Sequence, residues 1–329
     1  MGMSISTEEL DRTTVYIYNH QQEQGHLPNV AIDPSLLSYS GLDSTAVLQS
    51  YSSSMMEHLG DNGMRYAKEL ATTIGGFTSV PNAVGLGALV ISMLIETVAA
   101  SYRAPTGSHK DLLRRVFAEQ KVSELRDLMD EYLKRHEMHL LDDEKLLKDT
   151  QVLERQLSVQ LTRVRNAILK DGQMNDRAFK QWVNGAAFHI QMLIQLARLE
   201  RKGSTSARKA VGAYERDLEQ LLDSYKALKV SNIFFQKFLT QRCKQNRRRR
   251  DSLATLIDCY FCDREFGGAL VSKQFCSSWW DNTEFISNYV SYMMSNHKDF
   301  TEMKRYFSQT KYDLDSLIEQ RNNTFTLPH

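Results

Sequence analysis

The feature that most constrains this chain is a long stretch without proline, which runs from Gly107 to Leu327. Because proline breaks helices, a stretch without it can form long uninterrupted helices. Apolar residues within it recur every three or four positions with charged residues between them, as at Leu153, Leu157 and Leu161. This spacing is typical of amphipathic, coiled-coil-like helices. The sequence therefore predicts an all-α fold: an elongated bundle of long helices with one glycine-rich apolar helix packed inside.

The same pattern predicts where the helices begin and end. Ser6, Asp43 and Ser108 are suited to helix N-caps, and Pro81 is suited to a first turn. No segment alternates convincingly between apolar and polar residues, so no sheet is predicted. The expected helices are 6–22, 43–72, 81–102, 108–138, 141–170, 175–202, 206–228, 231–266 and 281–320.

Three consecutive regions are expected along the chain. Residues 1–42 hold an N-terminal acidic helix and a linker, residues 43–230 form the long-helix bundle, and residues 231–329 form a basic, cysteine-containing helical region. Residues 1–100 contain ten acidic and three basic side chains, although the formal net charge of the whole chain is +1. The rest of the chain is therefore basic, which favours anionic partners.

One segment differs from the rest because it lacks charge. Ala71 to Ile95 contain no charged side chain, and the dense apolar part is Ala83–Ile95. A membrane-spanning helix needs about 20 apolar residues, so this shorter run fits a buried core helix or a segment that inserts only conditionally. Its glycines permit a change of conformation. If the segment 74–101 inserts, the candidate residues are Gly85, Leu86, Leu89, Val90 and Leu94.

A polar bundle of long helices around one glycine-rich uncharged segment resembles the α-helical pore-forming toxins of the haemolysin BL and ClyA type. The resemblance is architectural, covers about residues 43–230 and matches no family motif, so no functional residue is carried over. It implies that the apolar element is stored against the bundle and released into a bilayer. The chain departs from the family because this element comes early and because the N-terminus lacks the features of a secretory signal. These departures favour an intracellular effector or membrane-remodelling protein.

Residues 226–250 form the most basic part of the chain, with nine basic side chains and no acidic one. Val230, Phe234 and Phe238 recur every four residues, which predicts a basic amphipathic helix. Such a helix fits an anionic membrane, a calmodulin-type partner or a solvated bundle face. A nuclear-localisation or nucleic-acid patch is a further reading of the arginine run, but no recognition motif supports sequence-specific binding. The predicted contact residues are Lys237, Arg242, Lys244, Arg247, Arg248, Arg249 and Arg250.

Two short motifs suggest covalent modification. The first residues match the N-myristoylation pattern, with Gly2 as the acylated residue and Ser6 in the final position. Arg249, Arg250 and the following Asp251 place Ser252 in a basophilic kinase motif, where phosphate would offset the arginine charge.

The four cysteines are weak candidates for a metal site because only two of them form a close pair. Reduced thiols that pack the last helices are the preferred interpretation, with redox use as an alternative. His136 and His139 are interpreted as surface residues rather than metal ligands. No catalytic motif is recognised, so the sequence predicts a protein that is not an enzyme and has no cofactor. The cysteines are Cys243, Cys259, Cys262 and Cys276.

The leading hypothesis is a non-enzymatic, membrane-active helical protein. The basic helix 226–250 docks on an anionic membrane surface, and the segment 74–101 then inserts as part of an oligomer. The alternative is a cytosolic coiled-coil adaptor that binds protein partners through its helix faces and keeps 74–101 as a buried core helix. Both readings expect a cytoplasmic protein, and the first adds peripheral association with a membrane.

Overall fold

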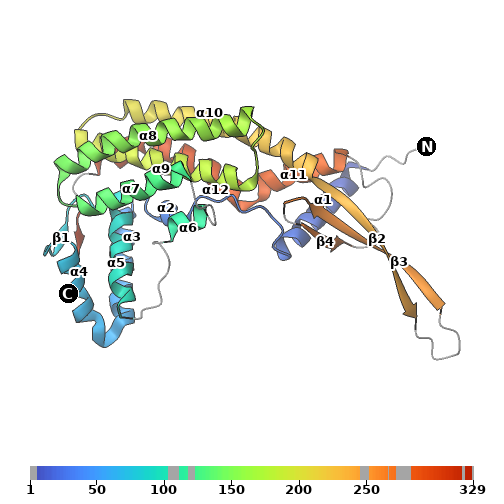
Figure 1. Cartoon of the computed structure of the whole chain (residues 1–329), viewed down its shortest axis with the longest axis horizontal. Helices are drawn as coiled ribbons and strands as arrows, with labels where there is room; N and C mark the ends of the chain where they lie inside the picture. Colours follow the sequence, from blue (N-terminus) through green and yellow to red (C-terminus); the bar gives the residue numbers. More distant parts are fainter. Residues whose placement is uncertain are drawn as a thin grey trace. The chain divides into compact units, whose positions relative to one another are not determined.

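The computed structural model describes residues 6–102, 111–117, 123–244, 252–265, 267–271, 283–320 and 323–327 (Figure 1). Most of them lie in helices, which confirms the predicted all-α class. The chain forms two compact units. Unit 1 contains residues 1–29, 174–176 and 222–301, and unit 2 contains residues 30–173, 177–221 and 302–329.

Unit 2 is a helical bundle whose long helices run side by side (Figure 1). Its core contains the largest buried aromatic side chains of α9, including Trp182 and Phe188. Its elements include α2 (Pro34–Ser38), α3 (Ser44–Leu59), η1 (Gly60–Asn62), α4 (Gly63–Thr73), β1 (Ser79–Val80), α5 (Leu86–Ala100), α6 (Leu112–Phe117), α7 (Glu124–Met138), α8 (Asp143–Lys170), α13 (Leu314–Glu319) and β5 (Phe325–Thr326). Helices α9 (Asp176–Glu200), α10 (Thr205–Asn232) and α12 (Lys298–Tyr312) contribute to both units.

Unit 1 combines two packed helices with a small antiparallel sheet. Its elements are α1 (Thr7–Glu23), β2 (Ile233–Lys244), β3 (Ser252–Asp263), β4 (Gly267–Val271) and α11 (Thr283–Asn296), with the adjoining ends of α10 and α12. Tyr18 of α1 and Tyr292 of α11 meet edge to face, with ring centroids 5.3 Å apart. The Asn288 amide of α11 donates to the Thr14 hydroxyl of α1 over 3.0 Å. These contacts fix α1 against α11.

The predicted helix starts are confirmed in part. The Ser6 side chain accepts from the Glu9 backbone N–H at 3.3 Å, as expected for an N-cap. Asp43 occupies the N-cap position of α3, but its side chain makes no capping bond. The predicted role of Pro81 is wrong, because α5 begins only after Gly85. Ser108 lies outside the described residues.

Several predicted long helices are divided in the structure. The helix expected over 43–72 is interrupted at Gly60, whose φ is +50°. Such a backbone angle ends a helix and favours glycine. The helix expected over 281–320 is three helices, α11, α12 and α13. The expectations over 141–170 and 175–202 agree with α8 and α9 to within two residues.

The prediction that the chain has no sheet is wrong. Residues expected as the helix 231–266 form β2 and β3, which pair antiparallel in one continuous register from Ile233↔Asp263 to Lys244↔Ser252. Strand β4 pairs with the inner end of β3, from Cys259↔Val271 to Asp263↔Gly267. Figure 1 shows β2 and β3 as a long two-stranded ribbon. The basic amphipathic helix over 226–250 is therefore corrected: α10 ends at Asn232 and a strand follows.

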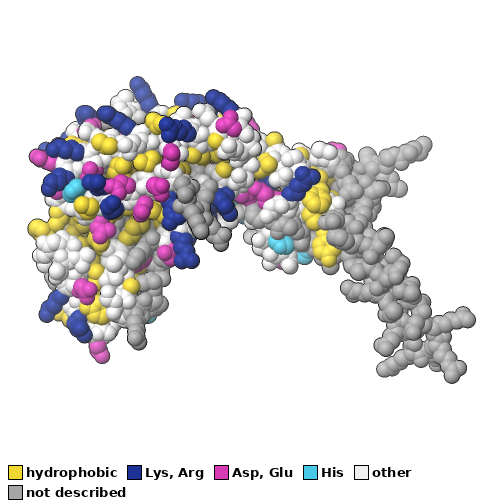
Figure 2. All heavy atoms as spheres, viewed as in Figure 1, with side chains coloured by type: hydrophobic (Ala, Val, Ile, Leu, Met, Phe, Trp, Pro, Cys, Tyr) yellow, Lys and Arg dark blue, Asp and Glu magenta, His cyan; other side chains and the backbone are white. Residues whose placement is uncertain are grey.

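The visible helical surface carries charges of both signs. In Figure 2, Lys and Arg side chains are interspersed with Asp and Glu side chains over the helices of unit 2. Surface ion pairs such as Arg165–Asp217 (2.7 Å) join α8 to α10. Mixed charge of this kind is typical of a solvated protein surface.

Candidate functional site

Helix α5 is the core of the candidate site, because it is the uncharged segment singled out by the sequence. Twelve of its fifteen residues are buried, and only Met93, Thr97 and Ala100 are not. Helices α2, α3, α4 and α7 of unit 2 pack around it. The prediction of one apolar helix packed inside the bundle is therefore confirmed.

All five predicted insertion residues lie together in and just before α5. Each is buried, and none of the four with a side chain is more than 4% exposed. In the folded chain these residues contact protein and not solvent. They are Gly85, Leu86, Leu89, Val90 and Leu94.

The buried polar side chains of α5 are hydrogen-bonded to the neighbouring helix α3 and within α5 itself. Glu96 is 1% exposed, and its carboxylate accepts from the Tyr51 hydroxyl at 2.9 Å. Burial, together with the charge of Glu96, raises the pKa of Tyr51 well above its ordinary value, so the phenol stays protonated. Burial likewise raises the pKa of Tyr39 to about 12. The Ser92 hydroxyl of α5 donates to the Leu89 carbonyl of the same helix at 2.7 Å. These contacts satisfy the polar atoms that α5 brings into the core.

The first turn of α5 lies against the buried side chains of Arg198 and His136. A Cβ at Gly85 would stand 3.1 Å from the Arg198 guanidinium, and a Cβ at Gly87 would stand 3.6 Å from the His136 ring. Gly85 therefore permits a close approach of Arg198 that a larger residue would hinder, whereas at Gly87 the tight contact of a Cβ would be with the Asn82 carbonyl at 3.0 Å. Arg198 is 7% exposed and donates through Nε to the Leu317 carbonyl at 2.7 Å.

The prediction that His136 is a surface residue is wrong. It is 2% exposed, and burial lowers the pKa of its imidazole to about 4. Its Nδ1 atom has no hydrogen-bond partner within the described part of the chain. By contrast, His139 is paired with Asp149 over 2.8 Å. Neither histidine belongs to a metal-binding group among the described residues.

The segment that leads into α5 is held by the C-terminal end of the described chain. Strand β1 pairs antiparallel with β5, with Ser79 opposite Thr326 and Val80 opposite Phe325. The ladder is extended by bonds from the Ala83 N–H to the Asn323 carbonyl and from the Leu327 N–H to the Thr78 carbonyl. Phe325 is fully buried, so this pairing is anchored in the core. We call residues 78–83 and 323–327 the C-terminal clamp.

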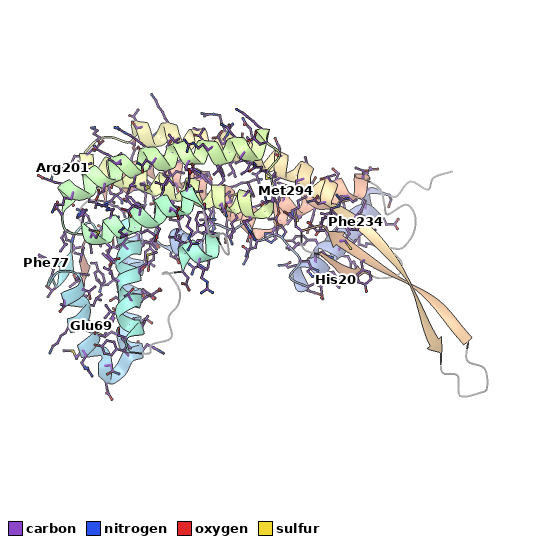
Figure 3. The ribbon with its side chains drawn as sticks, in the orientation of Figure 1. His20, Glu69, Phe77, Arg201, Phe234 and Met294 are labelled. Carbon is purple, nitrogen blue, oxygen red and sulfur yellow. The ribbon has the colours of Figure 1, made fainter. Side chains whose placement is uncertain are left out.

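A glycine turn separates the C-terminal clamp from α4. Gly75 and Gly76 have φ angles of +88° and +84°, which few other residues adopt. Phe77 follows and is 53% exposed (labelled in Figure 3). A Cβ at Gly75 would lie 3.5 Å from Phe77 and 3.6 Å from Leu141. The turn is therefore a solvent-facing joint between α4 and the segment that leads into α5.

Three of the seven predicted basic contact residues lie on a strand, and the other four lie outside the described residues. Lys237, Arg242 and Lys244 lie on β2 rather than on a helix. The four arginines 247–250 fall between β2 and β3, outside the described residues. The three described basic residues therefore belong to a strand and not to an amphipathic helix face.

The cysteine and modification candidates are also placed only in part. Cys243 lies on β2, and Cys259 and Cys262 lie on β3. Cys262 is buried, and burial raises the pKa of its thiol. Ser252 is the first residue of β3. Gly2 and Cys276 lie outside the described residues.

Sequence reasoning missed a buried ion cluster in unit 1. Lys229 is fully buried, and its ammonium lies 2.8 Å from Asp176, 3.1 Å from Asp263 and 2.5 Å from Glu265. The Tyr225 hydroxyl donates to Asp176 at 2.7 Å. Burial lowers the pKa of Lys229, but the three carboxylates outweigh that effect and raise it. The cluster joins the start of α9 and the end of α10 to the turn after β3.

Burial, with a hydrogen bond to Glu265, raises the pKa of Asp176 to about 7. Lys229 opposes this rise without cancelling it. The lysine is separated from Asp263 and Glu265 by more than thirty positions in the sequence. The only local signal was a lysine on the apolar side of a predicted helix.

Comparison with known proteins gives no relative: no protein family, curated protein or solved structure matches this chain. Among the helices that the structure describes, none combines the length and apolar character needed to cross a bilayer.

Proposed function

We propose that this protein is a non-enzymatic, membrane-active helical protein that stores α5 in its bundle and releases it at an anionic membrane. The ribbon β2–β3, with its basic residues, makes the first contact with the lipid surface. The C-terminal clamp then opens, and α5 moves from the helices of unit 2 into the bilayer. The resemblance to α-helical pore-forming toxins agrees with this sequence of events.

The observation that carries the proposal is the way in which the start of α5 is attached. A two-residue strand pair and two flanking backbone bonds hold the segment that leads into it. Two side chains of α3 add to them: the Thr45 hydroxyl donates to the Ala83 carbonyl at 2.7 Å, and the Ser44 hydroxyl accepts from the Gly85 N–H at 3.3 Å. Glycines with positive φ stand on both sides of that segment, at 75, 76 and 85. A small number of exchangeable hydrogen bonds between two glycine turns is an arrangement that can open without unfolding α5 itself.

The length of α5 limits what its insertion can do. Fifteen residues in a helix span about 22 Å, whereas the hydrocarbon core of a bilayer is about 30 Å thick. The proposal therefore assigns to α5 shallow insertion that perturbs the bilayer, and leakage requires several copies. Glu96 enters with its proton or stays near the headgroups, because a lone carboxylate in hydrocarbon is costly.

Lipid docking is assigned to β2 and the residues that follow it in the sequence, because basic residues are concentrated there. Strand β2 has Lys237, Arg242 and Lys244 and no acidic residue, and residues 247–250 are four arginines. Each basic residue near an anionic surface contributes about 1 kcal/mol of attraction, and salt screens it. Binding by this route is therefore expected to weaken as ionic strength rises.

The proposal is tested with a reversible covalent lock on the C-terminal clamp. Ser79 and Thr326 are exposed and directly opposite each other in the antiparallel pair. The Cβ atoms of such a pair lie about 4.5–5.5 Å apart, near the range that a disulfide bridges. The double variant Ser79→Cys/Thr326→Cys is prepared with Cys243, Cys259 and Cys276 replaced by Ser. Dye release from anionic and neutral vesicles is then measured before and after reduction.

We expect the oxidised variant to bind anionic vesicles without releasing dye, and the reduced variant to release it. The matched control is Thr326→Cys alone in the same background, which should respond to neither oxidant nor reductant. Equal dye release by the oxidised and reduced double variant refutes opening of the clamp. Absence of binding to every vesicle composition refutes the membrane function as a whole.

The alternative function is a cytosolic adaptor, and one observation favours it. A surface groove of about 540 Å³ lies between α7 and α8, with the apolar Leu128 and Val159 between charged residues. Val159 is 53% exposed, although it lies on a helix that is otherwise well packed. An adaptor would use this groove for an amphipathic partner helix and would keep α5 buried throughout. The vesicle experiment separates the two functions.

A further inference from the structure

The C-terminal segment 323–327 lies between β1 and α3 and is hydrogen-bonded on both of its edges. On one edge, β1 pairs with β5, with Ser79 opposite Thr326. On the other edge, the Gln49 side chain of α3 donates to the Thr326 carbonyl at 2.8 Å and accepts from the Thr326 N–H at 3.1 Å. Gln49 thus meets both backbone groups of Thr326, as a residue on a neighbouring strand would. We call the part of β1 and α3 that the segment covers the β1–α3 surface.

The side chains of the segment alternate between buried and exposed positions. Phe325 is fully buried and Leu327 is 4% exposed, whereas Thr324 and Thr326 are exposed. This alternation is typical of an extended strand with one face against the protein. Two apolar side chains, two positions apart, are therefore the anchors of the segment.

The bonds to Gln49 are made with the backbone of the segment, and two further backbone bonds extend the pairing. The Asn323 carbonyl accepts from the Ala83 N–H at 3.1 Å, and the Leu327 N–H donates to the Thr78 carbonyl at 2.9 Å. These bonds require an extended backbone and no particular side chain. Main-chain pairing combined with pockets for alternate side chains is the way in which proteins bind extended peptides beside a strand.

We propose that the β1–α3 surface is a binding site for an extended peptide of the pattern Phe-x-Leu from another protein, and that residues 323–327 occupy it as an intramolecular ligand. The incoming peptide replaces the segment, so that its backbone pairs with β1 and Gln49. Its Phe and Leu take the positions of Phe325 and Leu327. The inference concerns the same C-terminal clamp as the proposed function, but it requires neither lipid nor movement of α5.

The competing peptide comes from another protein rather than from a second copy, because the segment has little reach. Helix α13 ends at Glu319, and its Leu317 and Ile318 are buried. Only residues 320–322 connect this helix to the segment, and three residues span at most about 11 Å when fully extended. Such a short connection keeps the segment at its own site, at an effective concentration of about millimolar.

The test weakens the intramolecular ligand and leaves the β1–α3 surface intact. The variant Phe325→Ala removes the larger anchor, whose burial is worth about tenfold to a hundredfold in an equilibrium constant. A fluorescent synthetic peptide with the sequence of residues 320–329 is titrated into full-length wild type and Phe325→Ala in buffer without lipid, and its anisotropy is measured. We expect binding to Phe325→Ala that is at least about tenfold tighter than binding to wild type. The same peptide carrying Phe325→Ala should bind neither chain.

Further variants provide a second route and locate the bound peptide. Leu327→Ala removes the smaller anchor and should also bind the peptide more tightly than wild type, which keeps the test decisive if Phe325→Ala does not fold by circular dichroism. In either background, Gln49→Ala should weaken peptide binding by about fivefold or more, because two hydrogen bonds are lost. The matched control is Gln156→Ala, at an exposed position of α8, which should not change peptide binding.

Absence of peptide binding to both Phe325→Ala and Leu327→Ala overturns the inference, and so does equal binding of the peptide that lacks Phe. Sedimentation velocity of wild type provides a third measurement. A dimer that excess peptide converts to a monomer would identify a second copy as the occupant and would overturn the assignment to another protein.

The failures of the two proposals are distinguishable, because the peptide titration contains no lipid. Peptide binding without dye release from any vesicle would refute the membrane function alone. Dye release that depends on the disulfide lock, without peptide binding to either anchor variant, would refute this inference alone.

Discussion

Acid should destabilise unit 2 through His136, which lies beside the first turn of α5. The imidazole is 2% exposed, and burial lowers its pKa from the ordinary 6.5 to about 4. Protonation would place a positive charge in the core near Tyr132, whose ring meets the imidazole edge to face at 5.6 Å. Arg198 already places a guanidinium in the same core. A second positive charge on His136 would be repelled by it.

The magnitude follows from the shift. Because the pKa is depressed in the folded state, the unfolded chain binds the proton more tightly. The stability that neutral His136 contributes is therefore fully present above pH 6.5 and is lost as the pH falls toward 4. One pKa unit is worth about 1.4 kcal/mol. The loss is about 2 kcal/mol at pH 5 and about 3 kcal/mol once the folded state is also protonated.

The assay is urea unfolding of wild type and His136→Gln at pH 8 and pH 5. The Gln variant has no group that titrates at this position, so its stability should fall by about 2 kcal/mol less than that of wild type between the two pH values. The quantity compared is the change in unfolding free energy between pH 8 and pH 5 in each protein. Groups that titrate equally in both proteins cancel in this comparison. The matched control is His58→Gln, at an exposed position at the end of α3.

Equal pH dependence in wild type and His136→Gln would refute the reasoning, because the buried imidazole would then be no barrier to protonation. The reasoning would also be refuted if His58→Gln reduced the pH dependence of stability as much as His136→Gln does, since an exposed histidine should contribute little. If the expected result is obtained, dye release from anionic vesicles should be faster at pH 5 than at pH 8 for wild type only.

Three further substitutions test the contacts around α5 and the ion cluster. Lys229→Met should destabilise unit 1 by about 3–5 kcal/mol in urea unfolding, because three carboxylates then remain without their buried cation. Gly85→Ala should cost about 1–3 kcal/mol, since its φ of +57° with ψ of −129° is nearly restricted to glycine; an unchanged midpoint would contradict the backbone argument. Phe325→Ala should cost about 3–5 kcal/mol and increase hydrogen exchange in residues 78–83, because Phe325 is fully buried.

The helices could be predicted from the sequence wherever their apolar period was long and uninterrupted. Helices α8 and α9 begin and end within two residues of the expected positions. The division at Gly60 could not be predicted, because a glycine within a helical pattern indicates a break only when its backbone angle is known. The burial of α5 followed from its lack of charge.

The hairpin could not be predicted because its apolar spacing fits both periods. Phe234 and Phe238 are four residues apart, which places them on one face of a helix and also on one face of a strand. Composition was the remaining signal: β3 is rich in residues that favour strands, such as Ile257, Tyr260 and Phe261. Together with the neighbouring basic residues, the four-residue spacing of the phenylalanines predicts a basic amphipathic helix.

The buried polar contacts could not be predicted because they join distant parts of the sequence. Lys229 meets Asp176 and Glu265 only after α9, α10 and β3 are in place. His136 is interpreted from the sequence as a surface residue because it lies at the end of the helix predicted over 108–138. Which face of α7 is buried depends on α5, and neither the contact nor its geometry is visible in a local pattern.

The burial of α5 sets a condition on any function that uses its release. Seven large aliphatic side chains of this helix, from Leu86 to Val98, are at most 4% exposed. Exposing each to water costs about 1.5–3 kcal/mol, so exposing all seven costs about 10–20 kcal/mol. This sum is of the same size as the net stability of a typical domain, about 5–15 kcal/mol, or larger.

Helix α5 therefore cannot leave the bundle into water as a separate step, and an apolar acceptor must take it up as it leaves. Hydrogen exchange of α5 in buffer should accordingly be as slow as global unfolding, even in the reduced Ser79→Cys/Thr326→Cys variant. Anionic vesicles should change the protection of the helices that contact α5, while α5 itself remains protected in the bilayer. Rapid exchange of α5 in buffer would show that it opens without an acceptor, and the proposed dependence of its release on the membrane would be wrong.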